Sequence, residues 1–245
     1  MQQVFVDSNA VDGIFEIKGA DAHHLIRVVR IRIGEKIRVS NQENESFLCQ
    51  VIEIDGDCLK AEIVEQMEST ELPNKIYLFQ ALPKGDRMEN IIEKCVELGV
   101  HEIIPVEMKN CVVKLDDKKK KNKVARYNSV ALMAAQQSKR SIVPVVSDVM
   151  SFKEAYEYAK SMDIRLFTYE GKNGIQDTYD VLASIKPNQS IAVFVGPEGG
   201  FDASEVDMIK DTMHIISLGK RILRTDTAAI CSLSMLMLKC EEFCL

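Results

Sequence analysis

The sequence lacks the marks of a membrane, secreted or metal-binding protein. No apolar run is long enough to cross a membrane, and no signal-peptide pattern is present. We therefore expect a cytoplasmic protein. The seven cysteines are odd in number and form no CxxC pair, so we interpret them as small buried side chains. The four histidines have no ligand spacing, and we expect no metal.

Several familiar catalytic motifs are also missing. There is no GxxxxGK[ST] phosphate-binding loop, no GxGxxG after the first strand of an alternating unit, no GxSxG nucleophile turn and no HExxH. Nucleoside triphosphate hydrolysis, dinucleotide binding, serine hydrolysis and zinc proteolysis therefore lose their usual sequence support.

Positive charge is concentrated in two stretches of an acidic chain. The net charge is −6, yet residues 27–38 and 109–126 are both strongly basic. Two basic regions on an acidic protein indicate a polyanionic partner, with RNA the leading candidate. The lysine run 118–121 fits either a phosphate contact or a solvated helix face.

Two kinds of pattern divide the chain. Alternating apolar residues predict strands over 4–6, 13–19, 36–40, 47–54 and 59–67, with one helix over 21–29, which indicates a small β-barrel. Residues 68–75 have no periodicity and form the best linker. Strands and helices then alternate, and the apolar strands predict a parallel sheet covered on both faces. The expected domains are 1–70 and 75–245. The expected strands of the second are 75–82, 101–106, 144–147, 164–169, 191–195 and 214–218, and its expected helices include 85–98, 119–138 and 225–243. A further helix is expected to start at Asp202, with Glu205 in capping-box spacing.

Three glycine-containing loops follow apolar strands near the carboxyl end of the chain. They are TYEGKNG (168–174), GPEGGF (196–201) and SLGKRILRTDTA (217–228). Ligands of open α/β sheets bind beyond the carboxyl ends of the strands, and glycine lets main chain approach a ligand closely. Each loop alone fits an ordinary turn, but the three together predict one ligand pocket.

Five collinear segments resemble the RsmE-type ribosomal RNA methyltransferases, a branch of the SPOUT superfamily. They are HHLIRVVR (23–30), PKGDRMENIIEKCVELGVHEIIPV (83–106), AAQQSKRSIVP (134–144), FVGPEGGF (194–201) and LGKRILRTDTA (218–228). The resemblance covers nearly the whole chain. It implies a PUA-like β-barrel RNA-binding domain followed by an α/β-knot methyltransferase domain with a trefoil-knotted parallel sheet. It also implies a homodimer that uses S-adenosyl-L-methionine to methylate N3 of a specific uridine in 16S ribosomal RNA of the small subunit.

The same resemblance assigns roles to individual residues. Arg221, Arg224 and Asp226 are the candidate catalytic residues, with Arg221 the first choice for the cation. Arg224 could instead cap the final helix or pair with Asp226, which stands where the family usually has Glu. The candidate cofactor-binding residues are Phe167, Thr168, Glu170, Val195, Gly196, Glu198, Gly199, Gly200, Ser217, Leu218, Gly219, Ile222, Leu223 and Thr227. The candidate RNA-binding residues are His24, Arg27, Arg30, Arg32, Lys84, Arg87, Lys139 and Arg140.

Besides Asp226, the chain departs from the family pattern at three positions. Gln3 stands where the family has an arginine, and Lys109 and Asn110 replace Arg and Ser. Two alternative functions stay open from the sequence. One is another SPOUT methyltransferase, acting on the ribose 2′-O or on guanine N1. The other is a non-catalytic RNA-binding ribosome-assembly factor. The apolar final helix is expected either in the core or in a dimer interface.

Overall fold

The computed structural model describes residues 1–41, 43–169 and 175–244, which form two compact units. The first unit comprises residues 1–71 together with 135–143, and the second comprises 72–134 and 144–245. The return of segment 135–143 to the first unit is a feature that the contiguous expected domains, 1–70 and 75–245, did not include.

The first unit is built on a five-stranded mixed sheet in the order β1-β3-β4-β5-β2. β1 (Gln2–Val6) pairs in parallel with β3 (Lys36–Asn41), and the other neighbours are antiparallel. The remaining strands are β2 (Ile14–Ile17), β4 (Ser46–Asp55) and β5 (Cys58–Met67). The alternation of apolar and polar residues therefore located all five strands.

A short helix covers the core of this sheet. The expected helix over 21–29 is present as α1 (Gly19–His23), which continues as a π-helix, η1 (His24–Val29). The π-helix ends at Arg30, which adopts a left-handed conformation with φ of 60°. Leu25 is buried against Phe15, Ile37 and other core residues, whereas the basic side chains of this helix are exposed.

A buried polar cluster ties segment 135–143 to the sheet of the first unit. The Arg140 guanidinium is buried and forms an ion pair with Glu71, whose Oε1 also accepts a hydrogen bond from the Ser141 amide at 2.8 Å. Gln3 donates to the Arg140 carbonyl at 2.6 Å, and Arg38 donates to Ser141 at 3.2 Å. Burial lowers the pKa of Arg38. Gln3, which stands where the family has an arginine, therefore bonds within the first unit.

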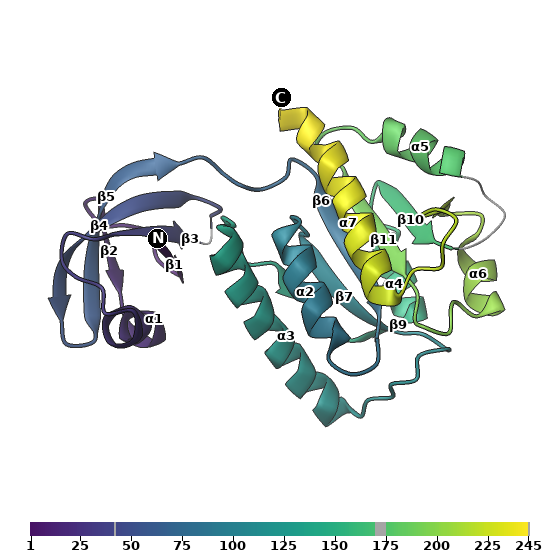
Figure 1. The fold of residues 1–245 in the computed structure, drawn as a ribbon, viewed down its shortest axis with the longest axis horizontal. Helices are drawn as coiled ribbons and strands as arrows, with labels where there is room; N and C mark the ends of the chain where they lie inside the picture. The colour runs from purple at the N-terminus through teal and green to yellow at the C-terminus, as the bar shows by residue number, and fades with distance from the viewer. Residues whose placement is uncertain (42, 170–174, 245) are drawn as a thin grey trace. The chain divides into compact units, whose positions relative to one another are not determined.

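The second unit contains a parallel sheet in the order β12-β10-β11-β6-β7-β8, with β9 also paired to β7 (Figure 1). Its strands are β6 (Lys75–Ala81), β7 (Glu102–Glu107), β8 (Val145–Val146), β9 (Met150–Ser151), β10 (Ile164–Thr168), β11 (Ser190–Val195) and β12 (His214–Ile216). The expected parallel sheet is confirmed.

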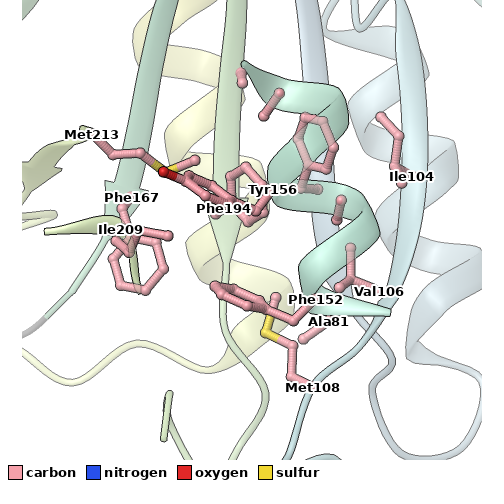
Figure 2. Packing of buried hydrophobic residues seen from close by; sticks show 14 of the residues in the cluster. Ala81, Ile104, Val106, Met108, Phe152, Tyr156, Phe167, Phe194, Ile209 and Met213 are labelled. Carbon is pink, nitrogen blue, oxygen red and sulfur yellow. The ribbon is translucent and has the colours of Figure 1, made fainter. Parts of the chain in front are cut away.

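Helices cover this sheet. α7 (Thr225–Glu241) contacts β6, β11 and α2 (Arg87–Glu97), while α4 (Phe152–Ala159) contacts β7. The remaining helical segments are α3 (Asp117–Ser138), α5 (Ile175–Ser184), α6 (Ala203–Ile209) and η2 (Glu242–Cys244). Figure 2 shows Phe194 of β11 beside Tyr156 of α4. The Phe194 ring also stacks on Phe79 at 4.3 Å, so aromatic packing fixes the centre of the sheet.

The sequence patterns did not predict two elements of the second unit. β9 has only two residues, which is too short for a periodic signal. α5 was also absent from the expected elements; it contains two large apolar side chains that are exposed, Ile175 and Tyr179. None of the helices within the described residues is both long enough and apolar enough to span a membrane.

Loss of the buried carboxylate in the first unit should destabilise the fold. Glu71→Gln leaves the Arg140 guanidinium, only 4% exposed, without its counter-charge. We expect the free energy of unfolding to fall by about 3 kcal/mol, measured by urea denaturation followed by circular dichroism. Lys94→Met, in an exposed ion pair with Glu97, should cost less than about 1 kcal/mol. Equal losses in the two variants would contradict this interpretation of the buried pair.

Candidate functional site: a cofactor-sized pocket of three loops

Three adjacent strands bring their carboxyl ends to one edge of the sheet. β12, β10 and β11 are neighbours and run in parallel, so the chain segments that follow them emerge side by side. A cavity of about 540 Å³ lies there, and all three segments line it. This volume falls in the usual range of small-molecule sites, about 300–1,000 Å³.

Most of the candidate cofactor-binding residues line this one cavity. They are Thr168, Val195, Gly196, Glu198, Gly199, Gly200, Ser217, Leu218, Gly219, Ile222 and Leu223. Phe167 is fully buried in β10 and does not line it, and neither does Thr227 in the first turn of α7. Glu170 lies outside the described residues. Further lining residues that the sequence did not single out are Tyr169, Pro197, Phe201, Thr225 and Ala228.

Two glycines of the loop 196–201 meet specific spatial constraints. A Cβ atom at Gly196 would come within 2.7 Å of the Phe201 ring, which itself packs on Phe167 with ring centroids 3.9 Å apart. Gly200 has a φ of +69°, and its N–H donates to the Pro197 carbonyl at 2.9 Å to close a turn. A larger residue at Gly196 would force the ring or the loop to move, whereas one at Gly200 would be strained by the positive φ.

Glu198, which lines the cavity, also connects the loop to the segment before α2. Its Oε1 accepts hydrogen bonds from the Lys84 amide at 3.1 Å and from Arg87 Nη1 at 2.7 Å. The single carboxylate of GPEGGF is therefore engaged by the segment that leads into α2. Arg87, a candidate RNA-binding residue, is half-buried in this ion pair, whereas the Lys84 side chain is exposed.

Lys109 and Asn110, two of the residues that depart from the family pattern, hold the other side of the loop. Asn110 Nδ2 donates to the carbonyls of Gly199 at 3.3 Å and Gly200 at 3.1 Å. Lys109 Nζ donates to Asp202 and Ser204, and its amide donates to Glu205. These contacts join the end of β7 to the loop and to the start of α6.

Asp202 and Glu205 form the capping box that the sequence predicts for α6. Hydrogen bonds from Ser204, together with the Lys109 ammonium, lower the pKa of Asp202 to about 2. The carboxylate therefore stays ionised at neutral pH and anchors the helix end of the loop.

The candidate catalytic residues lie where the third loop meets α7. Arg221 and Arg224 are exposed and line the cavity, and no described acidic side chain forms an ion pair with either guanidinium. The alternative in which Arg224 pairs with Asp226 is therefore not seen among the described residues. Arg224 occupies the N-cap position of α7 through its backbone, without a side-chain cap. Asp226 lies in the first turn of α7, and its buried Oδ1 has no described hydrogen-bond partner.

The candidate RNA-binding residues of the first unit fall into two environments. His24, Arg27, Arg30 and Arg32 are exposed on and just after the π-helix. Lys139 is half-buried, with its Nζ bonded to the Gln136 carbonyl, and burial lowers its pKa. Arg140 is only 3% exposed, so a direct contact with RNA would require its pair with Glu71 to open. No cluster of His, Cys, Asp and Glu among the described residues is arranged to hold a metal ion.

Comparison with known proteins identifies the family. A family model described as an RNA methyltransferase domain matches residues 70–237, and one described as an RNA methyltransferase PUA domain matches residues 17–64. The ribosomal RNA small subunit methyltransferase E of Bacillus subtilis is 37% identical over 93% of this chain and 91% of its own length. The chain belongs to the ribosomal RNA small subunit methyltransferase E family.

Further relatives extend this match. The Mesomycoplasma hyopneumoniae protein of the same name is 35% identical over 94% of this chain and 96% of its own length. A crystal structure of the Neisseria gonorrhoeae family member bound to S-adenosyl methionine has a TM-score of 0.82 and 29% identity, and the match covers 96% of both chains. The resemblance inferred from the five collinear segments is thereby confirmed, as is a PUA-like domain followed by an RNA methyltransferase domain built on a parallel sheet.

Asn110→Ala should loosen the glycine loop without unfolding the protein. It removes the amide that bonds two loop carbonyls, a loss of about 1 kcal/mol, which corresponds to roughly fivefold faster hydrogen exchange in residues 198–201. Mass spectrometry of exchanged peptides measures this. Asn128→Ala is the matched control, because that side chain bonds Val124 and Val146 instead. Unchanged exchange in Asn110→Ala would show that the loop does not depend on this contact.

Proposed function

We propose that this protein methylates N3 of a specific uridine in 16S ribosomal RNA of the small subunit, with S-adenosyl-L-methionine as methyl donor. The observation that carries the proposal is the pocket of three main-chain loops with two arginines at its edge that no described carboxylate pairs. Family membership over both units supports the same function.

The pocket fits the proposed cofactor in size and chemistry. Its lining combines apolar side chains such as Leu218, Ile222 and Leu223 with main chain around Gly196, Gly199 and Gly219. Amides and carbonyls of this kind can read the edge of an adenine, and the apolar side chains can cover its faces. The Gly199 and Gly200 carbonyls are already oriented by Asn110, so the loop is held before any ligand arrives.

The chemistry requires a deprotonated uracil N3 aligned with the methyl group. When bound, S-adenosyl-L-methionine supplies an activated methyl on a positively charged sulfur. The target base must leave its stack to reach a pocket, and placement of its N3 supplies much of the rate enhancement. Arg221 lines the cavity, and its proposed role is to stabilise negative charge on the uracil oxygens as N3–H loses its proton. Arg224 is the second candidate for this role, and Asp226 is the candidate base or brace.

The first unit supplies the proposed RNA-binding surface. Its exposed side chains His24, Arg27, Arg30 and Arg32 suit contacts to phosphates, which dominate RNA affinity. We further propose a homodimer with a trefoil knot in the second unit, and action in the cytoplasm on ribosomal RNA. On α7, Cys231 and Leu238 are exposed and Met235 between them is only partly buried, so these side chains form one apolar helix face that suits a dimer interface.

A direct assay tests the function. Small ribosomal subunits lacking the modification are incubated with the protein and labelled S-adenosyl-L-methionine, and mass spectrometry identifies the methylated nucleoside. The proposal predicts 3-methyluridine at a single site of 16S ribosomal RNA. A methylated ribose or guanine would instead support another SPOUT methyltransferase. Failure to bind the cofactor would favour the non-catalytic assembly factor, whereas cofactor binding without any product would mean a wrong substrate or a binding-only protein.

Arg221→Ala should impair the chemical step more than cofactor binding. Removal of one charge-stabilising donor costs about 100-fold in kcat, while the Kd for S-adenosyl-L-methionine should change by less than about threefold. Arg221→Lys should recover part of the rate, because it keeps the charge but loses the planar fork. Lys220→Ala is the matched control at the neighbouring exposed position. A kcat in Arg221→Ala equal to that of the control would remove Arg221 from the mechanism.

A further inference from the structure

A fully buried glutamine interrupts the apolar centre of the sheet in the second unit. Gln80 of β6 is 0% exposed and lies between Phe79 and Ala81, which are also 0% exposed. It pairs in register with Val195, the last residue of β11 before the glycine loop. Gln80 therefore lies on the neighbouring strand, beside the residue after which the loop begins.

The hydrogen bonds of Gln80 are incomplete. Its Nε2 donates to the Ala81 carbonyl at 3.0 Å and to Thr225 Oγ1 at 2.9 Å, but its buried Oε1 has no partner among the described residues. Burial of an amide with an unpaired oxygen destabilises a fold relative to an apolar side chain of similar size. Violations of this kind concentrate at functional sites, so the glutamine indicates a role other than packing.

Thr225 connects Gln80 to the loop through its hydroxyl group. Its hydroxyl donates to the Gly196 carbonyl at 2.7 Å. A hydroxyl has one proton, so Thr225 must accept the hydrogen bond from Gln80 while it donates to Gly196. The relay therefore has one direction, from the Gln80 amide through the Thr225 hydroxyl to the Gly196 carbonyl.

The relay fixes the peptide at which β11 becomes the loop. Gly196 and Thr225 both line the cavity, whereas Gln80 does not. The Phe201 ring closes the side of Gly196 where a Cβ would point, and the Thr225 hydroxyl holds its carbonyl. Because the Gly196 peptide is restrained on both sides, the main chain of the loop that follows it begins in a defined orientation.

We propose that Gln80 is a positioning residue of the cofactor pocket, which acts through Thr225 to hold the Gly196 carbonyl. The inference rests on the proposed function in taking S-adenosyl-L-methionine as the ligand. Because Gln80 does not reach the cavity, its loss should weaken cofactor binding in the ground state and the transition state alike. The KM for S-adenosyl-L-methionine should therefore rise while kcat changes little.

Four variants test the relay by isothermal titration calorimetry with S-adenosyl-L-methionine. Gln80→Leu and Thr225→Val should each raise the Kd about tenfold, and the double variant should also raise it about tenfold because both changes break one chain of contacts. Thr225→Ser keeps the hydroxyl and should stay within about threefold of the unaltered protein. Kinetics on ribosomal subunits should show the same change in KM, with kcat within about twofold.

Asn74→Leu is the matched control for lost stability. Asn74 is a second buried amide, 2% exposed, one residue before β6, and its Oδ1 also lacks a described partner. Its Nδ2 bonds the carbonyls of Lys186 and Gln189, away from the cavity-lining residues. This variant should lower the Tm without raising the Kd. If Gln80→Leu proves too unstable to purify, Gln80→Met replaces it, since methionine matches the length of glutamine.

The outcomes separate this inference from the proposed function. A Kd unchanged in Gln80→Leu, or effects of Gln80→Leu and Thr225→Val that multiply to about 100-fold, would overturn the relay while the cofactor assignment stands. A rise in Kd for Asn74→Leu equal to that for Gln80→Leu would also overturn it, because general destabilisation would then explain both. If the unaltered protein does not bind S-adenosyl-L-methionine, the proposed function fails and the relay's assigned role fails with it.

Discussion

The pocket depends on hydrogen bonds that neighbouring side chains give to the main chain of glycine-rich loops. Glycine leaves room for a ligand but gives a loop nothing with which to hold its own shape. The second loop is held by Asn110 and Thr225 on its carbonyls and by Glu198, which reaches out to the Lys84 amide. The third loop is held by Thr178 of α5, whose buried hydroxyl bonds both the amide and the carbonyl of Ser217.

These contacts explain how a pocket of mostly uncharged main chain is preorganised. Each restraining group comes from a different part of the second unit: the end of β7, the start of α7, the segment before α2, and α5. The loops therefore keep their shape only when the sheet and its helices are assembled around them. Because the restraint is already present in the protein, a ligand does not have to order the loops, which favours tight binding.

The sequence predicted the elements whose signal is local. Apolar runs located every strand of the parallel sheet except β9, and the spacing of Asp202 and Glu205 predicted the capping box of α6. The three glycine-containing loops that follow apolar strands also predicted one ligand pocket at the carboxyl edge of the sheet, where the cavity lies. Hydrophobic periodicity carries these features because burial of one face or of a whole strand leaves a regular pattern.

Features that depend on contacts between distant parts of the chain could not be predicted from the sequence pattern. Arg140 belongs to a basic segment, but its partner Glu71 lies 69 residues away in the sequence and buries it. Asn110 stood out only as a departure from the family pattern, and its contact with Gly199 requires the fold. Gln80 could be recognised in the sequence only as one polar residue within an apolar strand, which does not indicate its contact with Thr225. The catalytic roles of Arg221, Arg224 and Asp226 remain predictions, because their chemistry depends on a substrate.

Hydrogen exchange of the protein with and without S-adenosyl-L-methionine tests the central claim most directly. If the three loops form the cofactor site, slower exchange on addition of the cofactor should be confined to segments around 168–169, 195–201 and 217–225, which line the cavity. The helices of the first unit should exchange as before. Protection centred on other segments, or no protection at a saturating cofactor concentration, would contradict the account.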